Sequence, residues 1–405
     1  MDFTQFVKEL LHISEGFEIT RIEREMGNQP FIRIYLEYQL PYCKIDGITY
    51  RLYDHAPVRT WQHLCWFEYP CFIVCRLPRY IDSEGKVKLM EVSFAEKGKS
   101  YTRLFSAHVI EALQEMKVQS AVAKLFRTTS YIVRSIMEDA VEKALEARGA
   151  VTDLTAISLD EKAFRSGHHY ATILVDSEKD CVVELGEGRA EKDVKTLLYC
   201  ITSQEEQPQL ERVNMDMWQP YINVIEEVAP QAAIVHDKFH IVKKLSEAID
   251  KTRRKEVKNE PLLKKNRYTV LKNECNRTQE QQSIFAQLDK ANLKTAQAWH
   301  IRENFKLLFE VQDRTVSGNL LYDRMTHSMT KGLPFVNDVI KTIKNHIKGV
   351  VNALITRTDS GKHENINGRI QAILAKARGF KNFDRFRINV LFYFAKLYFN
   401  PLKFY

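Results

Sequence analysis

The stretch Leu-Thr-Ala-Ile-Ser-Leu-Asp-Glu (154–161) decides the fold, because a mostly apolar run of strand length ends there in two carboxylates. Two further strand-like runs follow, at His169–Val175 and Cys181–Leu185. The next predicted elements are a helix at Ala190–Ile201, a strand at Arg212–Met215, a helix at Gln219–Val228 and a strand at Ala232–Val235. Three strands joined by short turns, followed by alternating helices and strands, predict an α/β layer with a mixed sheet.

Asp160 is the first candidate functional residue, and we expect it at or near the C-terminal end of its strand. Because side chains alternate across a strand, Asp160 and Glu161 point to opposite faces, and only one of them can serve a site on a given face. We choose Asp160. An isolated carboxylate at a strand end is more often simply exposed to solvent, so this alternative stays open.

Asp216 is the second candidate, since it ends the apolar run Leu210–Met215 just before a predicted helix. An Asp in this place commonly caps the helix, and Pro220 in the first turn agrees with capping. The functional alternative gains weight because Asp160 already places one carboxylate at a strand end of the same layer.

Glu364 is the third candidate and lies on a predicted helix near the end of the chain. Asn367 and Gln371 follow it at helical spacing and form one polar stripe. Such a stripe is ordinarily a solvated face. It could equally border a metal site and a DNA backbone, with Arg369 and Arg378 near enough to contact phosphates.

Three carboxylates that converge from two strands and a helix would suit a pair of hard cations. Mg²⁺ prefers oxygen ligands and retains waters, and two such ions roughly 3.5–4 Å apart suit phosphodiester chemistry. One ion activates a water or a 3′-hydroxyl, and the other stabilises the departing oxygen. We therefore expect Mg²⁺ at Asp160, Asp216 and Glu364, with Mn²⁺ able to substitute for it.

Composition sets wider limits. The chain has 405 residues, 44% hydrophobic and 28% charged, which suits a globular protein of two or three domains. Its net charge of +8 permits a polyanionic partner without requiring one. Seven scattered cysteines argue against a disulfide framework and for a reducing compartment. No signal peptide and no apolar stretch of about 18 residues is apparent, so we expect a cytoplasmic protein without a membrane partner.

We predict five segments along the chain. They are a β-rich module at 1–100, a helix-turn-helix at 101–150, the first part of the α/β core at 151–240, a basic helical insertion at 241–350 and the last catalytic helix with the C-terminal helices at 351–405.

Two of these segments carry candidate DNA-binding residues. In the helix-turn-helix, a polar turn separates two helical runs, and the candidates are Arg127, Ser130 and Arg134. Any helical hairpin has the same outline, so a purely structural interpretation stays open. In the insertion the candidates are Arg253, Arg254, Lys264 and Lys265, although long helices often carry lysines on a solvated face.

Several short motifs together resemble one family. They are Leu-Asp-Glu-Lys-Ala-Phe-Arg-Ser-Gly-His-His-Tyr (159–170), Asp-Met-Trp-Gln-Pro-Tyr (216–221), Ala-Pro-Gln-Ala-Ala-Ile-Val-His-Asp-Lys-Phe-His (229–240), Glu-Asn-Ile-Asn-Gly-Arg-Ile (364–370) and Ala-Arg-Gly-Phe-Lys-Asn-Phe-Asp-Arg-Phe-Arg (377–387). The chain thereby resembles the DDE transposases of bacterial insertion sequences, specifically the ISL-three group. The resemblance covers most of the chain.

The resemblance implies an RNase H-like catalytic core with a helical insertion, and Asp160, Asp216 and Glu364 as the catalytic, metal-binding triad. Asp237 and His240 belong to a shared Asp-Lys-Phe-His motif and are expected to support the triad or the fold, as is Asn367. Asp237 is the reserve candidate should Asp216 point away from the site.

One departure from the family concerns zinc, since its members commonly carry paired Cys-x-x-Cys motifs near the N-terminus. Here only Cys43 remains at the first pair and no cysteine at the second, while Cys65, Cys71 and Cys75 lack that spacing. We expect a β-module without zinc. Its predicted core residues are Trp61, Trp66, Phe67 and Phe72.

The resemblance implies a transposase that binds the ends of an insertion sequence, cleaves DNA and joins the 3′-hydroxyl ends to target DNA. The expected partners are transposon-end and target DNA and a second copy of the chain, as a homodimer or larger assembly on DNA in the bacterial nucleoid. Two alternatives remain: an RNase H-like nuclease that does not join strands, and a domesticated DNA-binding protein without catalysis.

Overall fold

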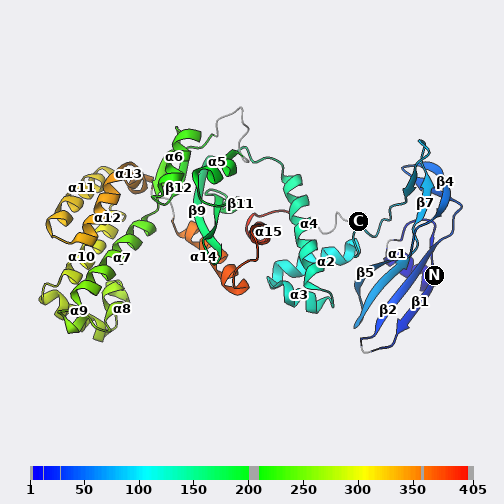
Figure 1. Ribbon diagram of the computed structural model, residues 1–405, viewed down its shortest axis with the longest axis horizontal. Coiled ribbons are helices and arrows are strands. Elements are labelled where there is room, and N and C mark those ends of the chain that lie inside the picture. Colours follow the sequence, from blue (N-terminus) through cyan, green and yellow to red (C-terminus); the bar gives the residue numbers. More distant parts are fainter. Residues whose placement is uncertain (1–2, 12, 28, 200–208, 357–359, 400–405) are drawn as a thin grey trace. The chain divides into compact units, whose positions relative to one another are not determined.

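The computed structural model describes all residues except 1–2, 12, 28, 200–208, 357–359 and 400–405. It divides into two compact units (Figure 1). Unit 1 comprises residues 1–149 together with 397–405, and unit 2 comprises residues 150–396. The finer segment boundaries expected from the sequence, at 100, 240 and 350, stay predictions.

Unit 1 begins with helix α1 (Phe3–Leu10) and two four-stranded sheets. The first sheet has the order β1 (Phe17–Glu25), β2 (Phe31–Tyr38), β6 (Tyr69–Cys75) and β5 (Arg59–Trp66). The second has the order β3 (Tyr42–Ile45), β4 (Ile48–His55), β7 (Pro78–Ile81) and β8 (Val87–Leu89). Alternation builds the core: Ile34 and Leu36 in β2, and Ile73 in β6, are all buried.

The expected core of the β-module is partly wrong. Trp61 is buried and Trp66 packs against the core, but Phe72 is only half-buried. Phe67 is 83% exposed and lies in a turn rather than in a strand. The sequence suggests one strand from Trp66 to Cys75, whereas the chain turns at Phe67 and Glu68 between β5 and β6.

The cysteines of this module lie among apolar side chains. Cys43, Cys71 and Cys75 are buried, and burial raises the pKa of the Cys71 and Cys75 thiols to about 12. A thiol with so high a pKa stays protonated, and a protonated thiol is a poor metal ligand. The expectation that the module holds no zinc stays a prediction.

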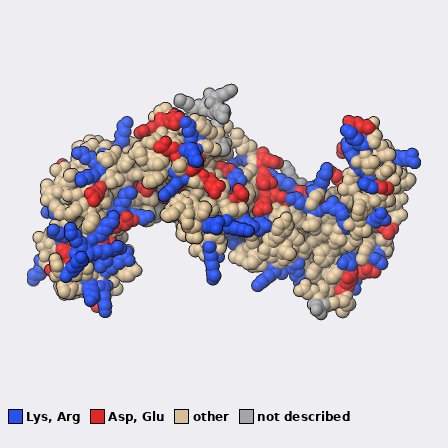
Figure 2. All heavy atoms as spheres, in the orientation of Figure 1, with Lys and Arg blue, Asp and Glu red and all other residues tan. Residues whose placement is uncertain are grey.

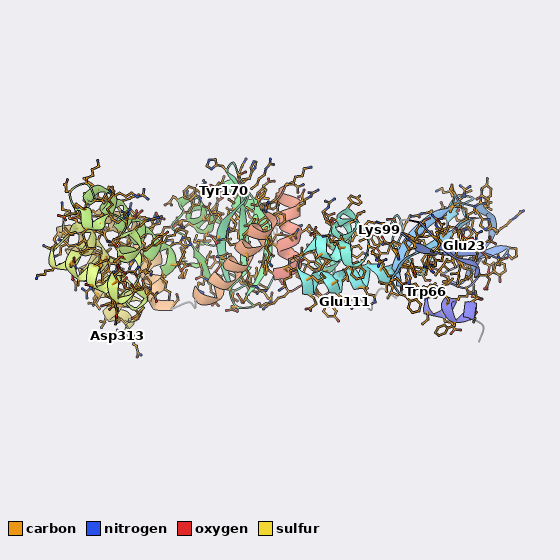
Figure 3. All side chains as sticks on the ribbon, turned by 90° about the horizontal axis from the view of Figure 1, so that it is seen from below. Glu23, Trp66, Lys99, Glu111, Tyr170 and Asp313 are labelled. Atoms are coloured by element: carbon orange, nitrogen blue, oxygen red, sulfur yellow. The ribbon has the colours of Figure 1, made fainter. Side chains whose placement is uncertain are left out.

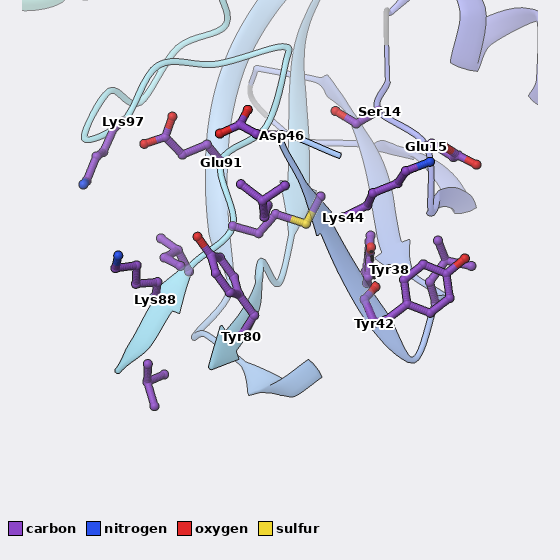
Figure 4. Close-up of a pocket in the computed structure, with 15 residues that line it drawn as sticks. Ser14, Glu15, Tyr38, Tyr42, Lys44, Asp46, Tyr80, Lys88, Glu91 and Lys97 are labelled. Atoms are coloured by element: carbon purple, nitrogen blue, oxygen red, sulfur yellow. Dashed lines mark hydrogen bonds between the residues drawn. The ribbon is translucent and has the colours of Figure 1, made fainter. Parts of the chain in front are cut away.

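A groove of about 860 Å³ in unit 1 is lined by Tyr38 at the end of β2 and by Tyr42 and Tyr80 of the second sheet (Figure 4). Its charged lining residues are Lys44, Lys88, Lys97, Glu15, Asp46 and Glu91. Because the cations and anions balance, the groove offers no net charge for selecting a ligand.

Three helices complete unit 1: α2 (Arg103–Met116), α3 (Gln119–Leu125) and α4 (Ser130–Arg148). Thr102 and Thr129 cap α2 and α4 by accepting hydrogen bonds from backbone N–H groups of the first turn. The short α3, a polar turn and the longer α4 have the predicted helix-turn-helix outline. Arg127 and Ser130 are exposed, while Arg134 is partly buried and lies 3.5 Å from Glu138.

Unit 2 is built on a five-stranded sheet of order β11-β10-β9-β12-β13. Its strands are β9 (Ala156–Arg165), β10 (His169–Asp176), β11 (Cys181–Glu187), β12 (Arg212–Met215) and β13 (Ala233–His236). The first three are antiparallel, and β12 and β13 continue parallel to β9. The predicted α/β class with a mixed sheet is confirmed.

Helices cover both faces of this sheet (Figure 1). On one face, α5 (Glu191–Tyr199) and α6 (Gln219–Val228) bury a core that includes Leu159 and Met215. On the other face, Phe386 of α15 (Phe383–Phe394) stacks on Phe164 of β9 with ring centroids 5.7 Å apart. Arg387 of α15 donates a 2.7 Å hydrogen bond to Glu184 of β11.

The insertion has a hydrophobic core of its own. Its helices are α7 (Lys238–Glu256), α8 (Arg267–Leu271), α9 (Gln279–Lys290), α10 (Lys294–Leu308), α11 (Arg314–Thr330), α12 (Pro334–Asn345) and α13 (Ile347–Thr356), with short 3₁₀ turns at Pro261–Leu263 and Glu274–Asn276. It rejoins the sheet where Asn352 of α13 donates a 2.7 Å hydrogen bond to the Ile234 carbonyl of β13. Helix α14 (Ser360–Ala377) follows. None of the described helices combines the length and apolarity needed to cross a membrane.

We predict that His63 makes the stability of unit 1 depend on pH. His63 is 8% exposed and 2.8 Å from the Thr102 hydroxyl, and burial lowers its pKa from 6.5 to about 4. Between pH 6.5 and pH 4, His63 therefore binds a proton more readily in the unfolded chain than in the folded one. The free energy of unfolding should fall by about 3 kcal/mol as the pH drops from 6.5 to 4. Urea unfolding across this range would measure the change.

The matched variant is His63→Gln, which retains a polar side chain that does not titrate. Its unfolding free energy should fall less steeply with acidity than that of the wild type. Identical slopes for the two proteins would refute the assignment to His63.

Candidate functional site

The pairing of β9 with β12 brings two predicted site residues together. The strands run parallel, and their last paired residues are Leu159 and Met215. Asp160 is the next residue of β9, and Asp216 directly follows Met215, the last residue of β12. Because residues in register on neighbouring parallel strands lie on the same face, the two carboxylates lie side by side where this pairing ends.

The face on which the carboxylates lie follows from the pleat. Leu159 and Met215 point into the core under α5 and α6, so the residues beside them point to the opposite face. Ser158 and Asn214 also lie on that opposite face, where Asn214 donates a 3.1 Å hydrogen bond to Ser177. Asp160 and Asp216 continue this polar stripe to the edge of the pairing.

The strand position of Asp160 corrects the expectation from sequence. Strand β9 does not end near Asp160 but continues to Arg165, and Asp160 itself pairs with Ile173 of β10. The β9–β10 hairpin extends beyond the short β12, which pairs only with residues 156–159. Asp160 is therefore at the end of its parallel pairing, although it is in the middle of its strand.

The capping alternative for Asp216 is wrong. Trp218 occupies the cap position of α6 and makes no side-chain capping bond. One Asp216 oxygen instead accepts a 2.6 Å hydrogen bond from the Met217 N–H, and the other lies 3.3 Å from His240 Nδ1. Burial raises the pKa of Asp216, but His240, the Met217 N–H and Lys244 outweigh burial and lower it to about 2.

Asp160 is held in the same manner. One oxygen accepts a 2.8 Å hydrogen bond from the N–H of Glu161, and the other lies 2.6 Å from Lys162 Nζ. Thus each carboxylate has one oxygen fixed by the next backbone N–H and the other beside a basic side chain. Sequence reasoning missed Lys162, although its place two residues after Asp160 puts it on the same face of the strand.

Helix α7 supplies the basic side chains near Asp216. Asp237 caps this helix by accepting a 2.8 Å hydrogen bond from the Phe239 N–H, which fixes where the helix begins. His240 and Lys244 then lie one turn apart on one side of the helix. Burial disfavours the charged form of His240, but its hydrogen bond to Asp216 and the nearby Asp160 raise the pKa overall. As a helix cap, Asp237 has a structural use that needs no metal.

His236 is a buried residue that contacts the backbone of β12 next to Asp216. It ends β13, is 2% exposed, and its Nδ1 lies 3.3 Å from the Met215 carbonyl. Burial lowers its pKa to about 4, so the ring is neutral at pH 7. Gly349 of α13 lies directly against this ring, since a Cβ at Gly349 would be 2.4 Å from a His236 carbon.

Glu161 points to the opposite face, as strand alternation predicts. Its two carboxylate oxygens accept hydrogen bonds of 3.1 and 3.0 Å from a single guanidinium nitrogen, Nη1, of Arg189. The Arg189 guanidinium lies 3.9 Å from the Tyr170 ring centroid and 5.2 Å from that of Trp218. Tyr170 is labelled in Figure 3.

Glu364 lies in α14, but its side chain and those of its neighbours at 360–365 lie outside the described residues. Asn367 is half-buried beside the buried Ile366 and Ile370. Among the side chains that the structure describes, no three of the types His, Cys, Asp and Glu are grouped to hold a metal. The convergence of Glu364 on the two aspartates stays a prediction.

The end of α14 is nevertheless tied to β9. The Phe380 N–H donates a 2.9 Å hydrogen bond to the Phe164 carbonyl, four residues beyond Asp160. The two flanking DNA-binding candidates, Arg369 and Arg378, are both exposed, and the Arg369 guanidinium also lies 4.9 Å from the Phe394 ring centroid.

The basic DNA-binding candidates of the insertion differ in the exposure of their side chains. Asp250, which is buried, attracts Arg253, Arg254 and Arg267. The Arg253 side chain is only 13% exposed, whereas that of Arg254 is 66% exposed. Figure 2 shows a dense basic surface in this part of the insertion, around the end of α7 and α8. Its exposed cations are Lys251, Arg254, Lys255, Lys258, Lys264, Lys265 and Arg267, which we call the basic patch.

Comparisons with known proteins agree with one another. A family model described as a transposase, that of the ISL3 group of DDE transposases, matches residues 157–390. The chain is 24% identical over 389 residues to the transposase for insertion sequence element IS1001 of Bordetella parapertussis, covering 93% of this chain and 95% of that one. It is also 24% identical over 373 residues to the transposase for IS1557 of Mycobacterium tuberculosis, covering 84% and 82%.

The contact between Gly349 and His236 yields a prediction. Gly349→Ala should destabilise the protein by about 1–3 kcal/mol, because its methyl group overlaps a ring that has no room to move. The control is Gly318→Ala in α11, where nothing lies within 4 Å of the added Cβ. That change should stabilise by up to about 1 kcal/mol, since alanine favours helix. Urea unfolding of both variants tests this, and equal stabilities would refute the packing argument.

Proposed function

Since the chain belongs to the transposase family of the ISL3 group, we propose that it binds the ends of an insertion sequence, cleaves DNA there and joins the freed 3′-hydroxyl ends to target DNA. One observation carries the proposal: the β9–β12 register sets Asp160 beside Asp216 on one face of the sheet. The fold is RNase H-like, as the family implies, with β9 at the centre of the mixed sheet.

The two aspartates fit the divalent cations that this family uses. Carboxylate oxygens are the ligands that Mg²⁺ and Mn²⁺ prefer, and we propose that Asp160, Asp216 and Glu364 hold them. When bound, two such cations polarise the phosphodiester and favour attack by a water or a 3′-hydroxyl.

The surrounding residues prepare the aspartates for this role. The N–H groups of Glu161 and Met217 each fix one carboxylate oxygen and so restrain its orientation. Lys162 and His240 balance negative charge that would otherwise drive the two carboxylates apart. We propose that both basic side chains also remain close to the DNA phosphate as it enters.

We propose two DNA-contacting surfaces, the helix-turn-helix and the basic patch. In the first, Arg127, Ser130 and Arg134 lie around the start of α4, where backbone N–H groups also favour a phosphate. In the second, exposed cations outnumber acidic side chains over a short segment. Because two ends must be held together for joining, we further propose a homodimer or larger assembly on DNA.

The catalytic proposal predicts that Asp160→Asn abolishes processing of DNA that carries the element's own ends. Loss of one metal-binding carboxylate should reduce cleavage and joining about a thousandfold, equivalent to ~4 kcal/mol of transition-state stabilisation. The matched control is Glu161→Gln, the adjacent carboxylate on the opposite face, which should leave both reactions largely intact. Gel assays with Mg²⁺ or Mn²⁺ would resolve cleaved from joined products.

The outcomes of this assay separate the alternatives. Cleavage without joining would indicate a nuclease, and end binding without either reaction would indicate a DNA-binding protein. Cleavage that survives in Asp160→Asn would place the metal site on other carboxylates.

The basic patch yields a further prediction. Replacing both Lys264 and Lys265 with Gln should weaken DNA binding and lower the slope of log K against log salt by about 2, roughly 1 for each phosphate contact. The control pair is Lys331 and Lys341, two exposed lysines elsewhere on the insertion. Equal slopes for the two double variants would refute a specific role for the patch. Arg253 is a poor choice for this test, because its side chain is engaged with Asp250.

A further inference from the structure

The turn between β5 and β6 contains a residue that the fold itself disfavours. Only Phe67 and Glu68 separate the two strands, whose nearest paired residues are Trp66 and Tyr69. Phe67 adopts a left-handed φ of 53° and is 83% exposed. Two-residue turns with a positive φ favour Gly, Asn or Asp, and a large apolar side chain gains nothing from exposure to water. A residue that is unfavourable both for its backbone conformation and for its exposure indicates a function other than stabilising the fold.

The same strand holds the turn of the helix-turn-helix. Gln62 of β5 is 6% exposed, and its amide nitrogen donates to the carbonyls of Phe126 and Arg127 at 3.2 and 3.3 Å. Its amide oxygen accepts a 2.8 Å hydrogen bond from the Thr128 hydroxyl. One buried side chain thus satisfies three polar groups of the α3–α4 turn. Strand β5 and the helix-turn-helix are therefore held together as one body.

Arginines flank the β5–β6 turn. The Arg24 guanidinium lies 4.4 Å from the Tyr69 ring centroid and donates a hydrogen bond to the Tyr69 hydroxyl. Arg127, from the helix-turn-helix turn, is exposed and also has a left-handed φ, of 50°. The pKa of Glu68 is lowered first by its own backbone N–H and then by Tyr69, with Arg24 and Arg127 contributing further. The charges of both arginines therefore act on Glu68, the residue next to Phe67.

The two helices of the helix-turn-helix also carry exposed apolar side chains near their turn. Leu125 at the end of α3 is 58% exposed, and Tyr131 at the start of α4 is 68% exposed. Trp66, at the end of β5, is labelled in Figure 3. Arginines that can meet phosphates, interleaved with aromatic rings that can meet sugars and bases, are the chemistry of a DNA-binding surface.

We infer that the β5–β6 turn is a wing of the helix-turn-helix, and that Phe67 contacts the same DNA duplex as α4, at base pairs next to those under the helix. This inference rests on the proposed function, because it takes the helix-turn-helix to be the DNA-contacting element. A protein partner is disfavoured by the two arginines that act on this turn, Arg24 and Arg127, because their charges match a polyanion. The wing adds apolar contact with bases to the phosphate contacts of Arg127.

The test exploits opposite effects on stability and on binding. Phe67→Asn relieves the strained turn, so the melting temperature should rise by a few degrees. The same change should weaken binding to a labelled duplex of mixed sequence about tenfold, with no change in salt dependence because no charge is lost. Arg127→Gln should instead lower the salt slope by about 1. The matched control is Val58→Asn, an exposed position just before the other end of β5, which should leave binding unchanged.

Photo-crosslinking locates the contact directly. A photoreactive phenylalanine analogue at position 67 should crosslink to the duplex, and the same analogue at position 58 should not. Crosslinks between two protein chains, or wild-type affinity in Phe67→Asn, would overturn the wing. Absence of any duplex binding by the wild type would overturn it as well.

The outcomes separate this inference from the catalytic proposal. Asp160→Asn should crosslink through position 67 as well as the wild type does, because binding does not require the metal site. If the wild type crosslinks but never cleaves or joins DNA, the catalytic proposal fails and the wing stands. If it cleaves and joins while Phe67→Asn binds normally, only the wing fails.

Discussion

The parallel pairing of β9 with β12 is the constraint on which the candidate site depends. It is only four residues long, yet it fixes which residue of β12 lies beside which residue of β9. A slip of one residue would turn Asp216 toward the core and bring Met215 to the polar face. The apolar residues under α5 and α6 prevent that slip, because burying Leu159 and Met215 is favourable only in the observed register. Core packing and site geometry are therefore set by one pairing.

Two carboxylates in adjacent positions repel each other, and the fold compensates for this with nearby basic groups. Lys162 lies on the same strand as Asp160, whereas His240 reaches Asp216 from α7. Helix α7 begins at its cap, Asp237, directly after β13, and α13 approaches His236 of β13 closely at Gly349. The insertion is thereby joined to the sheet by contacts at the site itself, so its position and the charge balance of the carboxylates are linked.

In unit 1, a single side chain likewise connects two structural elements. Gln62 lies in a β-strand, yet its side chain completes the hydrogen bonds of a turn between two helices. A helical hairpin alone would leave those carbonyl groups to water and would be free to bend at the turn. With Gln62 in place, the sheet and the helix-turn-helix share one geometry. Phe67 lies in the turn that directly follows β5. Because Gln62 holds β5 against the helix-turn-helix, the position of Phe67 relative to those helices is fixed as well.

The sequence alone determined most of the elements and the face on which each strand residue lies. Period-two alternation separates Asp160 from Glu161, and the helix predicted at Gln219–Val228 coincides with α6. These features are local, since they depend only on backbone geometry and on neighbours along the chain. Only the tertiary structure decided the register that sets Asp160 beside Asp216, and the exposure of Phe67. Those depend on partners distant in sequence, and spacing along one strand carries no information about the residue beside it on the next.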